Sequence, residues 1–445
     1  GGSELTPAGM FTVPPTAGTW TVRATLTADP QIIDDATVVA DFRGGRLVDG
    51  WGPEGEGLWA HEVVETSQAA DLVADAEHIY ALIRHTAPPS ATLVSLVEAT
   101  GLGKPGFGSG GVRSYTAPGG VKIDPRQLGL AADRLYIQGQ VVLDTVVSAA
   151  TLDSGQPIND FGTHKSQYSM RGATPDPSSG TVYVGIDDFG VVGAERLFPN
   201  GDVDMTWGDA GKRLLAAPSA WKSTWDPGKE LLVLRELEVD SSGRLYALLT
   251  SFDEANTGEV ALVMRLDTSG ALDPSFGLGG AALWAIDDQP GTDPKRMQIT
   301  ADGGIVVVGA DYGQWFATRL TADGDLDLGW GDGGHVHHAY MRDIGSPAST
   351  AGVDVAVMPD GHVVFLINIE PASELTALVR YTQDGQVDLD FGDPEADGDG
   401  WSLIDTAPVR LAPGVDGRVF VLGQFTYSDS DVTISDAWIN AVHTY

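Results

Sequence analysis

Two aspartate-rich stretches are the first segments of this chain whose residue types and spacing can bind a metal ion. One is "DGDLDLGWGDGG", residues 323–334, and the other is "DPEADGDG", residues 393–400. The second stretch places four carboxylates at alternate positions: Asp393, Glu395, Asp397 and Asp399. Ca²⁺ takes about six to eight oxygen ligands, which a glycine-rich acidic loop can supply. Ile404 stands where an EF-hand has its last glutamate, so this stretch predicts either a Ca²⁺ site of another kind or a solvated acidic turn.

The histidines of "GGHVHHAY" are a second candidate for metal binding. On a strand, His335 and His337 point to the same face, but Zn²⁺ would need a third ligand from elsewhere, such as His362. A pair of this kind also occurs on exposed strands that bind nothing. The segments 101–106 and 106–111 match G-x-G-x-x-G but open no helix, which a dinucleotide site requires. The chain has no G-x-S-x-G, Walker or H-E-x-x-H motif.

Two tryptophans mark an insertion that is a candidate for ligand binding. Trp221 and Trp225 lie four residues apart in the segment "APSAWKSTWDPGKELL", 217–232. Exposed aromatic side chains on a loop can stack on sugars or anchor a protein partner. They can equally fold over the edge of their own domain. Because inserted loops on a rigid scaffold often carry binding residues, this segment is our candidate binding loop.

The charge balance limits the classes of partner. Against 26 Lys and Arg stand 62 Asp and Glu, which gives a net charge of −36. Nucleic acid and anionic lipid would be repelled, so the expected partners are cations, basic protein surfaces or neutral glycans, and solubility alone is the other explanation. The chain has no cysteine and therefore no disulfide. No apolar run approaches the roughly 18 residues of a membrane helix.

One repeated unit predicts the elements that position these residues. An aromatic residue followed by glycine recurs about every 57 residues, at Trp51, Phe107, Phe161, Trp207, Phe276, Trp330 and Phe391. Four copies carry a longer frame, which begins at Arg196, Arg265, Arg319 and Arg380 and places an aspartate eight residues after each arginine. The arginines can pin their own turns through that aspartate, or they can form a ring for an anionic ligand. The aromatic residue is expected to be a wedge between repeats. Residues 323–334 then belong to the copy of this frame that begins at Arg319. The acidic stretch that stays a candidate for metal binding is 393–400.

Between these landmarks, a turn followed by an alternating β-rich run occurs seven times. The runs are residues 75–83, 132–139, 178–186, 241–249, 302–310, 360–368 and 416–424. Further strands are expected at 260–267, 315–322 and 376–383. A unit of this length with about four short strands is typical of a β-propeller blade. The chain is therefore predicted to be all-β, a seven-bladed β-propeller with four-stranded blades. Residues 36–43 and 436–445 resemble the same strand position of the repeat, which gives eight copies of that strand for seven blades. Either one of them is an extra strand at the ring closure, or residues 19–26 help to build an eighth blade.

The frame Arg-Leu-x-x-(Asp/Ser/Asn)-Gly-x-(Leu/Val)-Asp-x-x-(Phe/Trp)-Gly resembles the delta-60 β-propeller repeat of bacterial secreted and envelope proteins. The resemblance extends over nearly the whole chain from about residue 36. It implies a propeller that is usually exported and often has no assigned activity, and it implies no catalytic residues.

These observations together predict a flexible N-terminal lead, 1–18, followed by a single propeller domain, 19–445. We expect an exported, non-catalytic, monomeric binding module for a protein or glycan partner, with Ca²⁺ as its candidate stabilising ion. Its expected location is extracellular or in the bacterial cell envelope or periplasm. The alternative is a hydrolase or lyase with a carboxylate or histidine site at the central funnel.

Overall fold

A computed structural model describes most of the chain. The described residues are 18–25, 33–40, 47–48, 50–55, 57–61, 67–86, 89–141, 144–166, 170–188, 190–216, 231–252, 259–284, 292–311, 313–337, 350–369, 375–392, 400–404, 407–415, 417–429 and 432–444. The predicted N-terminal lead lies almost wholly outside these residues, and its boundary stays a prediction.

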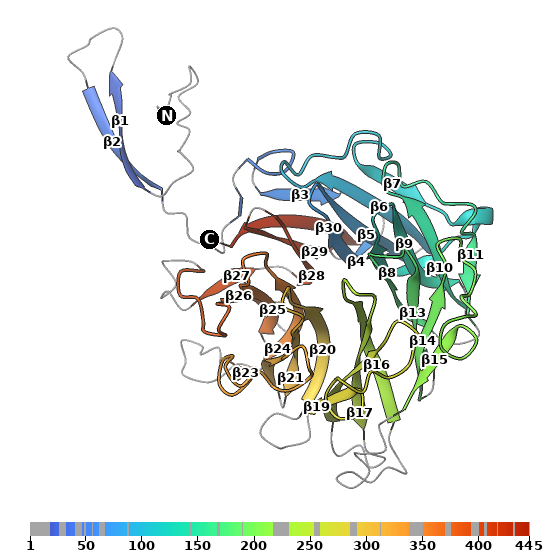
Figure 1. The fold of residues 1–445 in the computed structure, drawn as a ribbon. Helices are drawn as coiled ribbons and strands as arrows, with labels where there is room; N and C mark the ends of the chain where they lie inside the picture. The colour runs from blue at the N-terminus through green and yellow to red at the C-terminus, as the bar shows by residue number, and fades with distance from the viewer. Residues whose placement is uncertain are drawn as a thin grey trace.

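Seven four-stranded antiparallel sheets surround one axis and form a β-propeller (Figure 1). In the first six blades the strands follow chain order from the axis outward. Blade 1 contains β4 (Ser67–Ala74), β5 (His78–Thr86), β6 (Pro89–Val97) and β7 (Val112–Tyr115). Blade 2 contains β8 (Asp124–Leu130), β9 (Arg134–Val141), β10 (Asp144–Thr151) and β11 (Thr163–Lys165). Blade 3 contains β12 (Met170–Pro175), β13 (Val182–Asp188), β14 (Val191–Leu197) and β15 (Lys212–Leu215).

The next three blades repeat this plan. Blade 4 contains β16 (Leu231–Val239), β17 (Leu245–Phe252), β18 (Glu259–Leu266) and β19 (Ala281–Trp284). Blade 5 contains β20 (Thr292–Ile299), β21 (Ile305–Asp311), β22 (Gln314–Leu320) and β23 (His335–Val336). Blade 6 contains β24 (Thr350–Val357), β25 (Val363–Ile369), β26 (Leu375–Tyr381) and β27 (Trp401–Ile404).

Blade 7 closes the ring with strands from both ends of the chain. Its inner three strands are β28 (Ala407–Pro413), β29 (Arg418–Asp429) and β30 (Val432–His443), and its outer strand is β3 (Leu58–His61). β3 pairs antiparallel with β30, with Leu58 opposite Asn440. The closure therefore joins sequence positions almost 400 residues apart, and β3 supplies the fourth strand of the seventh blade.

The predicted eight-bladed alternative is wrong. Residues 436–443 belong to β30, the third strand of blade 7. Residues 36–40 instead belong to β2 (Ile33–Ala40), which pairs with β1 (Gly18–Thr25) in a separate two-stranded sheet. The two segments resembled each other because both are alternating β-rich runs. That pattern specifies a strand but not the sheet it joins.

The hydrophobic core lies between the blades. Seven clusters of buried side chains each join two adjacent sheets, including one that joins blade 7 to blade 1 around Trp51, Ile79 and Phe420. The second and third strands are covered on both faces, so they read as nearly continuous apolar runs such as β21. This is why the sequence marked these strands clearly. The predicted all-β, seven-bladed architecture is confirmed.

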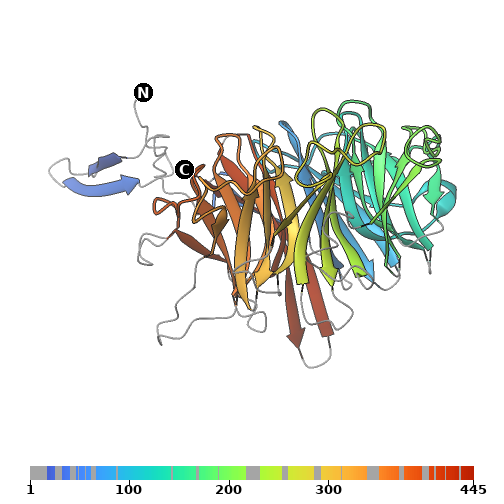
Figure 2. The same ribbon diagram turned by 60° about the horizontal axis from the view of Figure 1, so that its bottom comes forward.

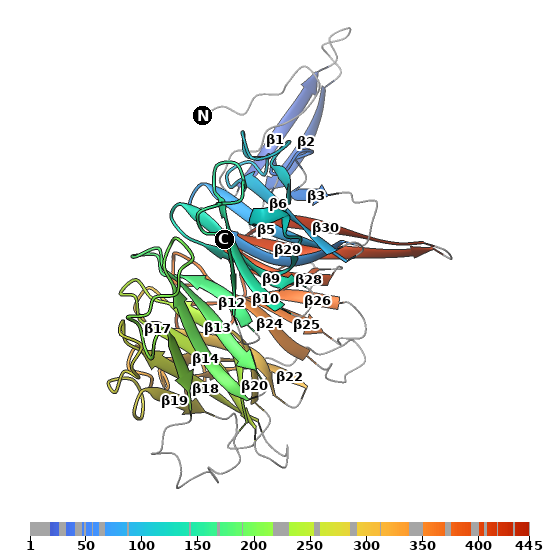
Figure 3. The same ribbon diagram turned by 90° about the vertical axis from the view of Figure 1, so that its right-hand side faces the viewer.

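The ring has two distinct faces (Figure 2). The turns between first and second strands open on one face, which we call the turn face. The hairpins between second and third strands, and the connections between blades, lie on the other, which we call the hairpin face. β29 and β30 each have twelve residues and pair as far as Asp429 with Val432, so they project beyond the ring (Figure 3). In the described part of the chain, the single helix is the three-residue 3₁₀ turn η1 (Pro118–Gly120), and no helix there can span a membrane.

Candidate functional site

The recurring arginines bind to the loops of their own repeats. The four pairs are Arg196 with Asp204, Arg265 with Asp273, Arg319 with Asp327 and Arg380 with Asp388. Arg265 Nε donates to the aspartate at 2.9 Å, and its Nη1 donates to the carbonyl of Ala322 in the next blade at 2.7 Å. The interpretation of these arginines as structural is confirmed, because each is bound to its own loop, and Arg196, Arg265 and Arg319 also donate to a carbonyl of the next blade.

The aromatic residue of each repeat is buried between blades. Trp330 is 1% exposed and lies against Gly385 of the next blade, where a Cβ would come within 2.4 Å of the Gly331 nitrogen and 2.9 Å of the indole ring. The N–H of Gly331 donates to the carbonyl of Asp384 at 2.9 Å. The predicted wedge between repeats is therefore confirmed.

The sites predicted from the tryptophans and the alternating carboxylates fall outside the described residues. Trp221 and Trp225 belong to the segment 217–230, and Asp393, Glu395, Asp397 and Asp399 belong to the segment 393–399. Both sites stay predictions. The described part of the chain contains no group of three His, Asp or Glu side chains arranged to hold a metal ion, and His335 Nδ1 lies 2.8 Å from the hydroxyl oxygen of Thr318.

The axial channel is lined by the first strand of every blade. Each of these strands contains a β-bulge at an equivalent position. A bulge inserts one residue and re-aims the next side chain. In all seven blades the residue after the bulge lines the channel, and we call this set the channel ring: Asp71, Gln127, Ala173, Glu236, Arg296, Asp354 and Arg410. The side chains of the channel ring differ from blade to blade, so the ring is not symmetric at the axis.

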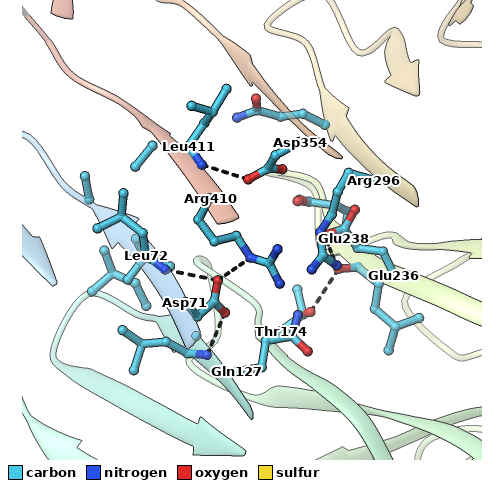
Figure 4. A pocket seen from close by; sticks show the side chains of 18 of the residues that line it. Asp71, Leu72, Gln127, Thr174, Glu236, Glu238, Arg296, Asp354, Arg410 and Leu411 are labelled. Carbon is cyan, nitrogen blue, oxygen red and sulfur yellow. Dashed lines mark hydrogen bonds and ion pairs between the residues drawn. The ribbon is translucent and has the colours of Figure 1, made fainter. Parts of the chain in front are cut away.

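Carboxylates of the channel ring hold adjacent blades together. Each accepts a hydrogen bond from a backbone N–H on the first strand of the next blade, a contact that we call a latch (Figure 4). The latches are Asp71 with Leu128 at 2.8 Å, Glu236 with Met297 at 2.6 Å, and Asp354 with Leu411 at 2.8 Å. Two guanidinium groups meet the same carboxylates, because Arg410 Nε donates to Asp71 at 2.8 Å and Arg296 Nη1 donates to Glu236 at 3.4 Å.

One channel carboxyl is not a latch. Glu238 lies two residues after Glu236 on β16, on the same face of the strand, and has no hydrogen-bond partner among the described residues. Burial raises the pKa of Glu236 to about 7, although Arg296 opposes the shift. Burial, together with the charges of Glu236 and Asp354, raises the pKa of Glu238 well above its ordinary value. The pKa of both carboxyls is therefore raised, as the pKa of a carboxyl that acts as a general acid must be.

The two mouths of the channel differ in charge. The residues of the channel ring line a cavity of about 400 Å³. Beside it on the turn face, a cavity of about 530 Å³ is lined by three aspartates, Asp75, Asp302 and Asp360, and one cation, Arg319. The cavity on the hairpin face is about 670 Å³; the described residues that line it include five cations, Arg126, Arg235, Lys295, Arg296 and Arg410, and no carboxylate. We call this second opening the basic mouth.

The sequence analysis did not identify the channel ring. The first strands were not assigned, because polar side chains and the bulge interrupt the period of two by which a strand is recognised. A signal exists in the distance to the first buried apolar residue of the next strand, which is eight residues in blades 1 and 2 and nine in the other five blades. Glu236 stands nine residues before Leu245, and Arg296 stands nine before Ile305, the first buried residues of their second strands.

Comparisons with known proteins agree with the repeat. Residues 248–276 and 300–329 match the family model described as "Domain of unknown function (DUF5122) beta-propeller". These segments lie in blades 4 and 5 and contain most of the frames that begin at Arg265 and Arg319. The match supports a β-propeller repeat family. No curated protein matches the chain.

The similar solved structures are propellers of low identity. The Cps50 (Swd1) β-propeller domain of Myceliophteria thermophila has 11% identity and a TM-score of 0.48, and the match covers 86% of this chain and 99% of that one. The WD40 domain of Toxoplasma gondii coronin has 10% identity and a TM-score of 0.47, with 91% and 89% covered. The blade count of this protein comes from its own strand pairing and not from these neighbours.

Proposed function

We propose that this chain is an exported, non-catalytic binding module whose rigid ring presents its faces to a protein or glycan partner. The observation that supports binding over catalysis is that three of the four carboxylates lining the channel are latches between blades. The resemblance of the repeat to the delta-60 type supports a place outside the cell or in the bacterial cell envelope. Stabilisation by Ca²⁺ at 393–399 belongs to the same proposal.

A latch is poorly suited to acid–base catalysis. A catalytic carboxyl must exchange a proton with its substrate at hydrogen-bond distance. Asp354 accepts bonds from its neighbour Val355 at 3.0 Å and from Leu411 in the next blade at 2.8 Å, so turning it toward a substrate would leave two buried N–H groups without an acceptor. Each such loss costs about 1–3 kcal/mol. The same holds for Asp71, which accepts bonds from two backbone amides and Arg410.

One observation favours the second candidate, a hydrolase or lyase with its site in the channel. Glu238 is not a latch, and its pKa is raised well above the ordinary value. The pKa of its neighbour Glu236 is also raised, to about 7. A carboxyl that stays protonated near neutral pH can donate a proton to a leaving group. In this reading Glu238 would be the acid.

A paired measurement separates the two candidates. The immobilised full chain is titrated with panels of purified envelope glycans and proteins by biolayer interferometry, and each mixture is examined for products by mass spectrometry. We expect saturable binding of at least one panel member, no product, and unchanged affinity in the matched variant Glu238→Gln. A product that wild type forms and Glu238→Gln does not would establish the second candidate. Failure to bind any member of either panel would contradict the proposed function.

A further inference from the structure

The basic mouth has a charge opposite to that of the molecule as a whole. The net charge is −36, yet the polar residues among the described part of this cavity's lining are cations and amides, with no carboxylate. Two aspartates lie behind the rim of this cavity, Asp124 and Asp293, and each pairs with two cations. Asp124 accepts from Arg84 at 2.9 Å and from Arg126 at 3.1 Å. Two cations against one aspartate leave an excess of positive charge on this side of the rim.

The opposite side of the rim has the same arrangement. Arg235 Nη2 lies 2.7 Å from Asp293, which also pairs with Lys295. The first member of each trio comes from one blade and the aspartate from the next, so the excess charge is fixed by the ring and not by a single loop. The neutral glycans expected from net charge alone therefore do not describe this cavity. Its local charge selects anions.

Two guanidinium groups lie deeper and are held in place. The side chain of Arg296 is 17% exposed and that of Arg410 is 18% exposed, and both project into the channel (Figure 4). Arg410 donates from Nε to Asp71 and from Nη1 to the carbonyl of Val409, which leaves Nη2 without a partner among the described residues. Arg296 donates only from Nη1 there, to Glu236. Donors fixed in this way can bind an oxyanion with little loss of side-chain entropy.

The rest of the lining selects for hydroxyl groups. Four amide side chains line the same cavity as the guanidinium groups: Gln127, Gln140, Asn368 and the more deeply buried Gln138. Amides both donate and accept hydrogen bonds, as sugar hydroxyls require. Among the described residues that line the cavity there is no aromatic side chain on which a neutral sugar ring would stack. The volume of about 670 Å³ is within the range of small-molecule sites.

We propose that the basic mouth binds a sugar acid, with the carboxylate held by Arg296 and Arg410 and the hydroxyls by the surrounding amides. This inference rests on the proposed function as a binding module and names the chemical class of one ligand. The sugar acid can be a free hexuronate or the exposed end of an acidic polysaccharide, because the recognised groups are the same.

Isothermal titration of the full chain at low salt tests the proposal. The probes are galacturonate, trigalacturonate, galactose and inorganic phosphate. We expect both uronates to bind and galactose not to bind, and phosphate to bind at least about tenfold more weakly than galacturonate because it lacks the hydroxyls that meet the amides. Tighter binding of trigalacturonate would identify a polymer end as the source, and equal binding would identify the free sugar.

The variant Arg296→Gln should weaken galacturonate binding by about tenfold or more, as expected for losing a charge-assisted bond. Lys295→Gln, at an exposed position, should weaken it less and serves as a second variant if Arg296→Gln does not fold. Arg244→Gln is the matched control, because Arg244 also pairs with an aspartate, Asp240 at 2.6 Å, but on the turn face.

Three results would overturn the inference: no binding of either uronate, phosphate binding as tightly as galacturonate, or equal weakening by Arg244→Gln. In each case, binding of another glycan or of a protein in the panels above would leave the proposed function standing. The two proposals therefore fail separately.

Discussion

Replacing Gly385 with alanine tests whether the aromatic wedge holds adjacent blades together. Gly385 has a φ of +75°, and an added Cβ would lie 2.4 Å from the nitrogen of Gly331 and 2.9 Å from the ring of Trp330. A backbone nitrogen and a buried indole both have little room to move in a close-packed interior. Gly333 is the matched control, because its φ is +62° but a Cβ there would meet nothing within 4 Å.

The expected magnitudes follow from this difference. An alanine in the left-handed region costs roughly 1–2 kcal/mol, and this term applies to both variants. Overpacking adds about 1–3 kcal/mol and applies to Gly385 alone. We expect Gly385→Ala to lower the free energy of unfolding by about 2–5 kcal/mol and Gly333→Ala by about 1–2 kcal/mol.

Urea denaturation followed by tryptophan fluorescence and far-ultraviolet circular dichroism measures both values. If the slopes with denaturant are equal, the shift in midpoint reports stability directly. The excess loss in Gly385→Ala should shrink in the background of Trp330→Ala, which removes the ring that the new methyl group would meet. Equal losses in Gly385→Ala and Gly333→Ala would refute the wedge, since only the backbone term would then be measurable.

Urea denaturation checks the two effects on the free energy of unfolding that follow, and thermal denaturation checks the two effects on Tm. The raised pKa of Glu236 means that the unfolded chain loses this proton first as the pH rises from 4.5 toward about 7, so wild-type stability should fall across that window and Glu236→Gln should flatten the fall. Removing residues 1–61, which include β3, should lower the Tm by several degrees, whereas removing 1–40 should leave it nearly unchanged; equal effects would contradict the role of β3 in closure. Asp354→Ala should cost about 2–6 kcal/mol by leaving the amides of Val355 and Leu411 without an acceptor, and Asp354→Asn, which keeps one acceptor oxygen, should cost less. Ca²⁺ should raise the Tm in wild type but not in Asp397→Ala, and no rise in wild type would count against a Ca²⁺ site.

The repeat made the ring predictable because its residues act through local geometry. Arg265 and Asp273 are eight residues apart and meet across one loop, so the same pair recurs wherever the loop does. The buried second strands were equally clear, since both of their faces are covered and nearly every residue is apolar. Each of these features has its cause within about one repeat of sequence.

The closure strand and the channel ring could not be predicted in the same way. Leu58 finds its partner Asn440 only because seven blades complete a circle, and nothing local to either residue specifies that pairing. Residues 36–40 had an equally good strand pattern and joined another sheet. In the channel, Asp71 meets Arg410 across the ring closure, although the two are 339 residues apart.

Net charge failed as a guide to the channel for the same reason. Whether a carboxylate repels a ligand depends on what has already neutralised it, and in this ring the neutralising cation often comes from a neighbouring blade. Arg84 and Asp124 are 40 residues apart, and Arg410 reaches Asp71 across the closure. A chain with 62 acidic residues can therefore present a cavity lined by cations, because its acidic residues are unevenly engaged and not because they are few. The positions that specify a ligand are then those where the repeats differ, and the seven positions of the channel ring, which differ from blade to blade, meet at the axis.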